Sequence, residues 1–294
     1  MDFLYFLQNL RNTPLNMLAQ FVTYFGQELV LVGIICITYW CINKTIAYKA
    51  CCSYFVSGLV VQTLKVTFRI ERPFLIDKRL HPVDSAVSAA TGYSFPSGHT
   101  QGATSIYSSL AFSLKKRCLS IIFTIIIVLV GFSRMYLGVH SPKDVLVSLT
   151  ISLLLSIVVD KFFDYFFEND KRKLLFLICM EIINILLIIY CYYLVRYNKT
   201  TEVLSKDCFV TLGGVMGYFL GLYIEDKYIK YDTACKSIAL QVLKVILGLL
   251  GLLVIKTCLP IIIGKSIIAN IVRYFLIALW LSGIYPIIIK KVFN

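Results

Sequence analysis

Three short polar stretches stand out in this sequence because their residue types and spacing suit phosphoryl transfer. They hold two histidines, three basic side chains, an aspartate and a small glycine-containing turn, in a chain with only three histidines among 294 residues. The stretches are a K-x6-RP pattern at Lys65 and Arg72, a PSGH turn at residues 96–99, and an SR-x5-H-x3-D pattern at residues 133–144. If the three meet in space, they form one cationic site.

The basic residues and the turn predict a binding site for a phosphoryl group. A phosphoryl group in transfer spreads negative charge over three oxygens, and fixed cationic donors stabilise that charge. The sequence offers three such donors: Lys65, Arg72 and Arg134. A helix start at PSGH would add the N–H groups of Ser97, Gly98 and His99, and a glycine allows close approach of an anion to the backbone. No carboxylate cluster suited to magnesium accompanies these residues, so we expect no metal and no other cofactor.

The two histidines of these motifs have different expected roles. His140 is the predicted nucleophile, because Asp144 follows four residues later and can hold the other ring nitrogen, fixing the tautomer and stabilising the imidazolium. His99 would then protonate the departing oxygen and later activate the water that attacks the phosphohistidine. The third histidine, His81, has no carboxylate at that spacing and is expected to be a loop residue.

Each of these residues also has a purely structural interpretation. The segment 141–144 reads as a helix start, in which Asp144 is only a capping residue. His99 alone is compatible with an ordinary helix-start position, and Lys65 and Arg72 with side chains that extend to the membrane interface. The occurrence of all three motifs, in order and on one predicted face of the membrane, favours the catalytic interpretation.

The elements that position these residues are predicted to be membrane-spanning helices. Hydrophobic residues make up 59% of the chain and charged residues 15%, with a mean hydropathy of +0.80, which is typical of an integral membrane protein. Several apolar runs approach the roughly 20 residues that a helix needs to cross a bilayer. We therefore predict an all-α polytopic bundle of about nine transmembrane helices, at about residues 25–42, 48–68, 98–114, 118–136, 143–163, 174–195, 207–225, 235–258 and 266–289.

We expect one membrane domain over residues 1–294, with a catalytic core at about 50–165 and additional spans at about 174–289. No linker or internal repeat divides the chain. The additional spans carry almost no polar motif. Their small-residue pattern at Gly213, Gly217 and Gly221 indicates close helix packing.

The distribution of basic residues predicts how the chain lies in the membrane. A net charge of +13 would suggest nucleic acid for a soluble protein, but here we expect no nucleic acid partner. Without the motif-bearing loops, basic residues are more frequent in the loops on the C-terminal side, which places the C-terminus in the cytoplasm and the motifs outside. Counting the motif loops in full removes this bias. The expected location is a bacterial plasma membrane, with the active site on the extracytoplasmic face.

The motifs resemble those of the type 2 phosphatidic acid phosphatase superfamily, whose membrane members dephosphorylate lipid phosphates. Every fixed position of the family pattern is matched, over about residues 50–165. The resemblance implies a helical-bundle core. The nine predicted spans with an outward-facing site also look like the layout of the glucose-6-phosphatase and sphingosine-phosphate phosphatase branches. It also implies that His99 is the acid, that His140 is the phosphorylated nucleophile and Asp144 its partner, and that phosphate is held by Lys65, Arg72, Ser97, Gly98 and Arg134.

The leading hypothesis is a metal-independent phosphatase that hydrolyses a phosphomonoester or pyrophosphate of a lipid through a phosphohistidine. The lipid would be of the phosphatidic acid, phosphatidylglycerophosphate, polyprenyl pyrophosphate or sphingoid-phosphate type. A phosphotransferase that passes the group to another lipid or sugar acceptor is the alternative. An anion or lipid transporter is a third hypothesis, although a histidine with a carboxylate partner exceeds what anion binding requires. The expected partners are the lipid phosphate substrate and membrane lipids; the sequence carries no prediction of oligomeric state.

Overall fold

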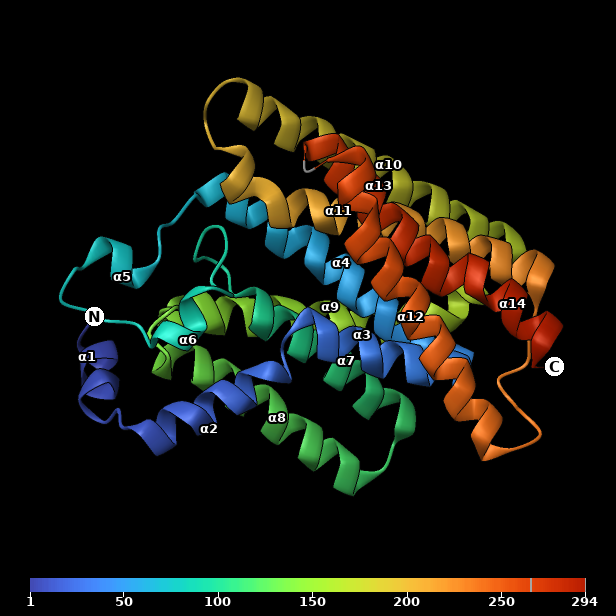
Figure 1. The fold of residues 1–294 in the computed structure, drawn as a ribbon, viewed down its shortest axis with the longest axis horizontal. Helices are drawn as coiled ribbons and strands as arrows, with labels where there is room; N and C mark the ends of the chain where they lie inside the picture. Colours follow the sequence, from blue (N-terminus) through green and yellow to red (C-terminus); the bar gives the residue numbers. More distant parts are fainter. Residues whose placement is uncertain (265, 294) are drawn as a thin grey trace. The chain divides into compact units, whose positions relative to one another are not determined.

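The computed structural model of the chain describes residues 1–264 and 266–293, in which every regular element is a helix. The first half of the chain contains α1 (Asp2–Asn9), α2 (Thr13–Tyr24), α3 (Glu28–Ile37), the π-helical η1 (Thr38–Ile42), α4 (Lys44–Phe68), α5 (Pro73–Ile76), α6 (Asp84–Val87), α7 (Gly98–Leu114), α8 (Arg117–Tyr136) and α9 (Pro142–Phe167). The second half contains α10 (Asp170–Arg196), α11 (Glu202–Ile224), η2 (Glu225–Ile229), α12 (Ile238–Ile263), α13 (Ile267–Leu279), η3 (Trp280–Ile284) and α14 (Tyr285–Val292). The predicted all-α fold is confirmed (Figure 1).

The chain forms two compact units. Unit 1 consists of Met1–Val32, Lys49–Lys161 and the short segment Val203–Asp207. Unit 2 consists of Gly33–Tyr48, Phe162–Glu202 and the chain from Cys208 onward. The single membrane domain expected from the sequence stays a prediction.

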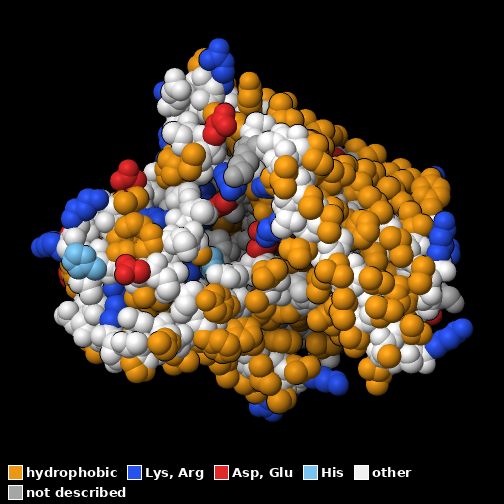
Figure 2. Space-filling model, in the orientation of Figure 1, with side chains coloured by type: hydrophobic (Ala, Val, Ile, Leu, Met, Phe, Trp, Pro, Cys, Tyr) orange, Lys and Arg blue, Asp and Glu red, His pale blue; other side chains and the backbone are white. Residues whose placement is uncertain are grey.

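Fewer than nine helices meet the length and hydropathy expected of a membrane span. Within the described residues, seven helices are long and apolar enough to cross a bilayer, or up to eight if the bent pair of α2 with α3 and η1 forms one span. Nine spans are therefore not confirmed. Apolar side chains cover much of the visible surface in Figure 2, and along α12 exposed residues such as Val242, Leu253 and Ile261 present an apolar face suited to lipid.

The helix α7 corresponds to the span predicted at residues 98–114, but it is not among the helices that are long and apolar enough to cross a bilayer. Its 17 residues make it about 26 Å long, shorter than the roughly 30 Å of a bilayer core. Most of its side chains are buried and several are polar. Gln101 donates to the carbonyl oxygen of Tyr54 at 3.0 Å and to the Ser57 hydroxyl at 2.8 Å, and the hydroxyls of Ser57 and Ser105 lie 2.6 Å apart. Gln101 and Ser105 of α7 thus find hydrogen-bond partners on α4 inside unit 1.

In unit 2, the glycines of α11 allow the close packing expected from their spacing. A Cβ atom added at Gly213 would lie 2.4 Å from the carbonyl oxygen of Ile271, and one at Gly217 would lie 2.1 Å from that of Phe275, both on α13. At Gly221 the nearest atom would be Oγ of Ser282, at 2.0 Å. The prediction of a helix-packing stripe is confirmed, since side chains at these positions would push α11 and α13 apart.

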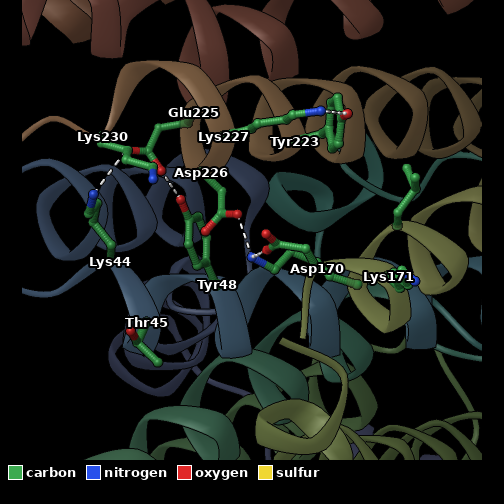
Figure 3. A pocket seen from close by; sticks show the side chains of 12 residues that line it. Lys44, Thr45, Tyr48, Asp170, Lys171, Tyr223, Glu225, Asp226, Lys227 and Lys230 are labelled. Carbon is green, nitrogen blue, oxygen red and sulfur yellow. Dashed lines mark hydrogen bonds and ion pairs between the residues drawn. The ribbon is translucent and has the colours of Figure 1, made fainter. Parts of the chain in front are cut away.

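Unit 2 also contains a cavity of about 580 Å³ at the ends of α4, α10 and α11 (Figure 3). Five lysines and three carboxylates line it, together with aromatic and apolar residues. The buried Glu225 accepts from Lys44 Nζ at 2.9 Å and from the Tyr48 hydroxyl. Lys173 pairs with Asp170 at 3.4 Å and with Asp226. Glu225 and Asp226 therefore take part in ion pairs that join helix ends, whereas Asp170 pairs within α10.

Candidate active site

All eight residues predicted for the site belong to unit 1. Lys65 lies near the C-terminal end of α4, and Arg72 immediately precedes α5. Ser97 is the N-cap of α7, in which Gly98 and His99 are the first two residues. Arg134 lies in the last turn of α8, His140 in the loop that follows, and Asp144 in the first turn of α9. Four helix ends and two loops therefore supply the site.

The chain that leads into His140 is held by buried apolar contacts and backbone hydrogen bonds. Leu137 and Val139 are fully buried and belong to a small apolar cluster with Ala86. The carbonyl oxygen of Leu137 accepts from the backbone N–H of Val83 at 3.0 Å. Arg11 donates from Nε to the carbonyl oxygen of Tyr136 at 2.8 Å. Buried apolar groups and backbone hydrogen bonds thus fix the path of the chain up to His140.

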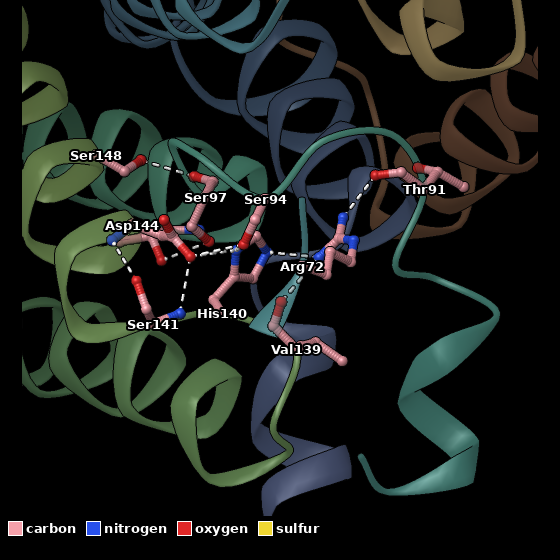
Figure 4. A network of polar contacts seen from close by, with 10 residues as sticks. Arg72, Thr91, Ser94, Ser97, Val139, His140, Ser141, Asp144 and Ser148 are labelled. Atoms are coloured by element: carbon pink, nitrogen blue, oxygen red, sulfur yellow. Dashed lines mark hydrogen bonds and ion pairs between the residues drawn. The ribbon is translucent and has the colours of Figure 1, made fainter. Parts of the chain in front are cut away.

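His140 and Asp144 form the pair that the spacing predicted (Figure 4). Nδ1 of His140 lies 3.6 Å from Oδ2 of Asp144, and both side chains are almost fully buried. The same carboxylate oxygen accepts from the backbone N–H of Ser141 at 2.7 Å and from the Ser94 hydroxyl at 2.6 Å. The amide of Asp144 in turn lies 3.4 Å from the Ser141 hydroxyl, which completes a capping box. Asp144 therefore both caps α9 and faces His140.

The other ring nitrogen of His140 faces Arg72. Nη1 of Arg72 lies 3.2 Å from His140 Nε2 and donates to the carbonyl oxygen of Val139 at 3.0 Å, while Nη2 donates to the carbonyl oxygen of Thr91. These contacts hold the guanidinium plane from both ends (Figure 4). A neutral His140 with its proton on Nδ1 matches both neighbours, since Asp144 accepts and Arg72 donates.

Burial lowers the pKa of His140 below the usual histidine value. Asp144 opposes this shift by favouring the imidazolium, whereas the positive charges of Arg72 and Arg134 add to it. A depressed pKa keeps the imidazole neutral at pH 7. Its unprotonated Nε2 then faces the basic residues, where Arg72 Nη1 lies 3.2 Å away.

Several buried donors of this cluster have no hydrogen-bond partner among the described residues: Arg72 Nε, His99 Nε2, and Arg134 Nε and Nη2. Arg134 is fully buried, and its Nη1 donates to the Thr23 hydroxyl at 2.8 Å. Electrostatic interactions connect His99 with Lys65, Arg72, Arg134 and His140. Unpaired buried N–H groups are costly, and several cations around one imidazole repel one another. An anion with several oxygens would accept hydrogen bonds from these N–H groups and offset the positive charges.

The start of α7 fits close approach of that anion to the backbone. Lys65 Nζ lies 3.5 Å from the position that a Cβ on Gly98 would occupy. A side chain at this position would therefore fill space beside the lysine ammonium. The N–H groups of Gly98 and His99 belong to the first helical turn, where helix geometry provides no intrahelical acceptor.

Ser97 departs from its expected geometry. The sequence predicted that its backbone N–H is free for phosphate, but this group donates to the carbonyl oxygen of Asp144 at 3.1 Å. Its hydroxyl accepts from the Thr100 backbone at 3.4 Å and from the Thr100 hydroxyl at 3.0 Å, and its carbonyl oxygen accepts from Ser148 at 2.6 Å. Ser97 thus joins α7 to α9, and only its hydroxyl proton remains as a donor for an anion.

Sequence reasoning gave no role to four further residues of this network: Thr23, Thr91, Ser94 and Asp207. Ser94 lies beside the PSGH motif, and its hydroxyl is also 3.4 Å from His140 Nδ1. A serine two residues before that motif is a signal that could have been noticed. The other three carry no local pattern, because they reach the site only through the fold. His81 is exposed, as expected of a loop residue.

The arrangement combines a neutral, carboxylate-oriented imidazole, a second histidine and three buried cations. Within residues 1–264 and 266–293, no group of three or more His, Cys, Asp or Glu side chains could hold a metal ion. Lys65, Arg72 and Arg134 are the basic side chains at this site. Such a group of residues is suited to binding phosphate and to attacking phosphorus from a histidine nitrogen.

Both halves of this chain are similar in sequence to known proteins. Residues 46–168 match the PAP2 superfamily, and residues 209–293 match the transmembrane extension of PAP2 superfamily phosphatases. Undecaprenyl-diphosphatase BcrC of Bacillus subtilis (strain 168) is 30% identical over 159 residues, which cover 52% of this chain and 77% of that protein. Sphingosine-1-phosphate phosphatase 2 of Homo sapiens is 25% identical over 220 residues, which cover 70% of this chain and 53% of that protein.

A solved structure, that of the first transmembrane PAP2 type phosphatidylglycerolphosphate phosphatase from Bacillus subtilis, is 26% identical, with a TM-score of 0.48. The match covers 56% of this chain and 84% of that chain. The chain spans about half the length of the human relative and about three quarters of the bacterial diphosphatase. The family motifs, the domain match and the identity to the bacterial diphosphatase lead to one conclusion: this chain is a member of the PAP2 superfamily.

Proposed function

We propose that this chain is a metal-independent membrane phosphatase that hydrolyses a phosphomonoester or pyrophosphate of a lipid through a phosphohistidine on His140. The observation that carries the proposal is the set of buried, unpartnered N–H groups of Arg72, Arg134 and His99 around an imidazole held by Asp144. The names of the relatives support a lipid substrate, since each names a phosphatase of a lipid phosphate or diphosphate.

The first step forms the phosphohistidine. Phosphate oxygens bind Lys65, Arg72 and Arg134, and Nε2 of neutral His140 attacks phosphorus. The bound phosphate offsets the positive charges around His99 and favours its protonated form. As the N–P bond forms, the bond from phosphorus to the leaving oxygen breaks, and His99 gives its proton to that oxygen. Asp144 stabilises the positive charge that develops on the His140 ring.

The second step releases phosphate. His99, now neutral, takes a proton from water while the water oxygen attacks phosphorus. The N–P bond breaks, and the electron pair returns to His140. Inorganic phosphate leaves, and His99 is protonated again. The balance requires one water for each phosphoryl group and no further reactant.

The membrane location of the site supports an anchored substrate. The residues that frame it lie at ends of helices that are long and apolar enough to cross a bilayer, such as α8 and α9. A lipid headgroup at that level reaches the site while its tail stays in hydrocarbon. From the distribution of basic residues, we place this end of the helices on the extracytoplasmic face of a bacterial plasma membrane.

The test is phosphate release by the purified protein in detergent with EDTA present. The substrates are phosphatidic acid, phosphatidylglycerophosphate, undecaprenyl pyrophosphate, sphingosine phosphate and glucose 6-phosphate. We expect release from at least one of the four lipids, equal rates with and without EDTA, and loss of activity in His140→Ala. His81→Ala is the matched control, because it removes an exposed histidine outside the cluster.

Full activity of His140→Ala would contradict the mechanism, and loss of activity in EDTA would contradict metal independence. Transfer of phosphate to an added lipid or sugar acceptor in place of water would indicate a phosphotransferase. Hydrolysis of glucose 6-phosphate with no hydrolysis of any lipid would contradict the substrate class.

A further inference from the structure

The start of α11 contributes to the catalytic unit although it lies far along the chain from the three motifs. Val203–Asp207 belongs to unit 1, whereas the rest of α11 belongs to unit 2. This segment contacts the loop that leads into the PSGH turn. The contacts involve a carboxylate, Asp207, for which neither the motifs nor the mechanism provides a role.

A continuous chain of hydrogen bonds leads from Asp207 to the phosphate-binding cluster. The Thr91 hydroxyl donates to Oδ2 of Asp207 at 2.6 Å. The carbonyl oxygen of the same Thr91 accepts from Nη2 of Arg72. Gly92, with a φ of +59°, packs so closely that an added Cβ would lie 3.0 Å from the carbonyl oxygen of Leu204 on α11. The backbone at residues 91–92 is thus held against the first turns of α11.

This support determines how Arg72 presents its guanidinium. The group is planar, so fixing both terminal nitrogens fixes the direction of the third. Nη1 is held by the carbonyl oxygen of Val139, and Nη2 by that of Thr91. The remaining Nε is the buried donor without a partner in the described part of the chain. Displacement of the Thr91 carbonyl would let the guanidinium plane turn away from the phosphate.

We propose that Asp207 is a positioning residue of the active site, which holds the Thr91 carbonyl in place and through it orients Arg72 toward the phosphate of the substrate. The start of α11 thereby completes the catalytic centre. This inference rests on the proposed phosphatase function. It gives the segment that leads into the transmembrane extension a part in catalysis through Arg72.

A simple charge effect predicts the opposite result, which makes the proposal testable. Asp207 interacts electrostatically with both Lys65 and Arg72, and a negative charge there opposes the binding of an anion. If that were its only influence, removing the carboxylate would tighten phosphate binding. If it positions Arg72, removing it weakens binding and slows turnover.

The experiment compares Asp207→Ala, Thr91→Val and the double variant with the wild type. The readouts are kcat/KM on the lipid that the wild type hydrolyses best, and calorimetric affinity for inorganic phosphate. We expect each single variant to lose about tenfold in both, the effect of one hydrogen bond to a charged group. The double variant should lose no more than either single variant, because both changes break the same chain of contacts.

Two controls separate positioning from loss of structure. Thr91→Ser keeps the hydroxyl and should retain wild-type kinetics. Glu202→Ala removes an exposed carboxylate from the first turn of the same helix and should do the same. Thermal unfolding followed by circular dichroism identifies any variant that is not folded. If Asp207→Ala is not folded, the comparison of kcat/KM between Thr91→Ser and Thr91→Val tests the positioning role.

Wild-type kinetics in both Asp207→Ala and Thr91→Val would overturn the proposal, and so would tighter phosphate binding in Asp207→Ala. Losses that multiply in the double variant would show two independent effects and would also overturn it. A wild type that hydrolyses none of the lipids would instead contradict the proposed function. The two failures are therefore distinguishable.

Discussion

Gly26 offers a demanding test of how the fold positions His99. It lies between α2 and α3, at the 44° bend of that pair. A Cβ added there would lie 2.7 Å from Cγ1 of Val130, 2.8 Å from the carbonyl oxygen of His99 and 3.2 Å from the His99 Cβ. The Val130 side chain can turn away. The backbone of His99 cannot move without moving the start of α7.

The size of the effect follows from these distances. The contact with the His99 carbonyl is about 0.6 Å shorter than ordinary van der Waals contact, so Gly26→Ala must shift His99 or the bend by that amount. Since a displacement of about 1 Å can cost about a hundredfold in rate, we expect kcat/KM to fall about tenfold. We expect the free energy of unfolding to fall by about 1–3 kcal/mol, as for other overpacked sites.

The assay is phosphate release from the preferred lipid, combined with thermal unfolding by circular dichroism. Gly33→Ala is the matched control, because it places the same methyl group on α3 where no atom of the described residues lies within 4 Å. That variant should retain its kinetics and gain stability, as alanine is the better helix former. Equal kcat/KM values for the two folded variants would refute the idea that Gly26 sets the position of His99.

Two further predictions concern His140 and its partner. Ser94→Ala removes the 2.6 Å hydrogen bond to Asp144 and should lower the free energy of unfolding by about 1.5–3 kcal/mol. Ser152→Ala removes a buried hydroxyl with no partner within the described ranges and should lower the free energy of unfolding by less. Equal melting temperatures of the two variants would contradict the importance of Ser94. Burial lowers the pKa of His140, so the folded protein keeps this imidazole neutral below pH 6.5, the ordinary histidine value. The acid limb of kcat/KM due to His140 should therefore lie below pH 6.5. The free energy of unfolding should fall as the pH drops below 6.5, because the unfolded chain then binds a proton that the folded protein does not. An acid limb at or above pH 6.5 that matches the titration of His140 followed by NMR would contradict the sign of this shift.

The motifs and most helix positions could be predicted from sequence because both depend on local patterns. The spacing of His140 and Asp144 places them one helical turn apart, and the capping box at Ser141 confirms that geometry. Apolar runs located the long helices in the same way. Hydropathy does not distinguish burial in lipid from burial in protein, and for this reason the sequence alone does not show that most of α7, including Gln101, is buried by protein.

The supports of the site depend on contacts between distant segments. Ser97 loses its backbone donor because the carbonyl oxygen of Asp144 happens to lie within reach. Thr23 satisfies Arg134, and Asp207 satisfies Thr91, across long sequence separations. No spacing rule relates these residues. Their roles follow only once the helices are packed.

The most direct test of the proposed phosphohistidine mechanism is to trap the covalent intermediate. Wild-type protein in excess over a ³²P-labelled lipid phosphate is quenched with alkali during a single turnover, and the labelled peptide is mapped by mass spectrometry. We expect label on Nε2 of His140, with none in His140→Ala. Turnover without label on His140, or with label on His99, would contradict it.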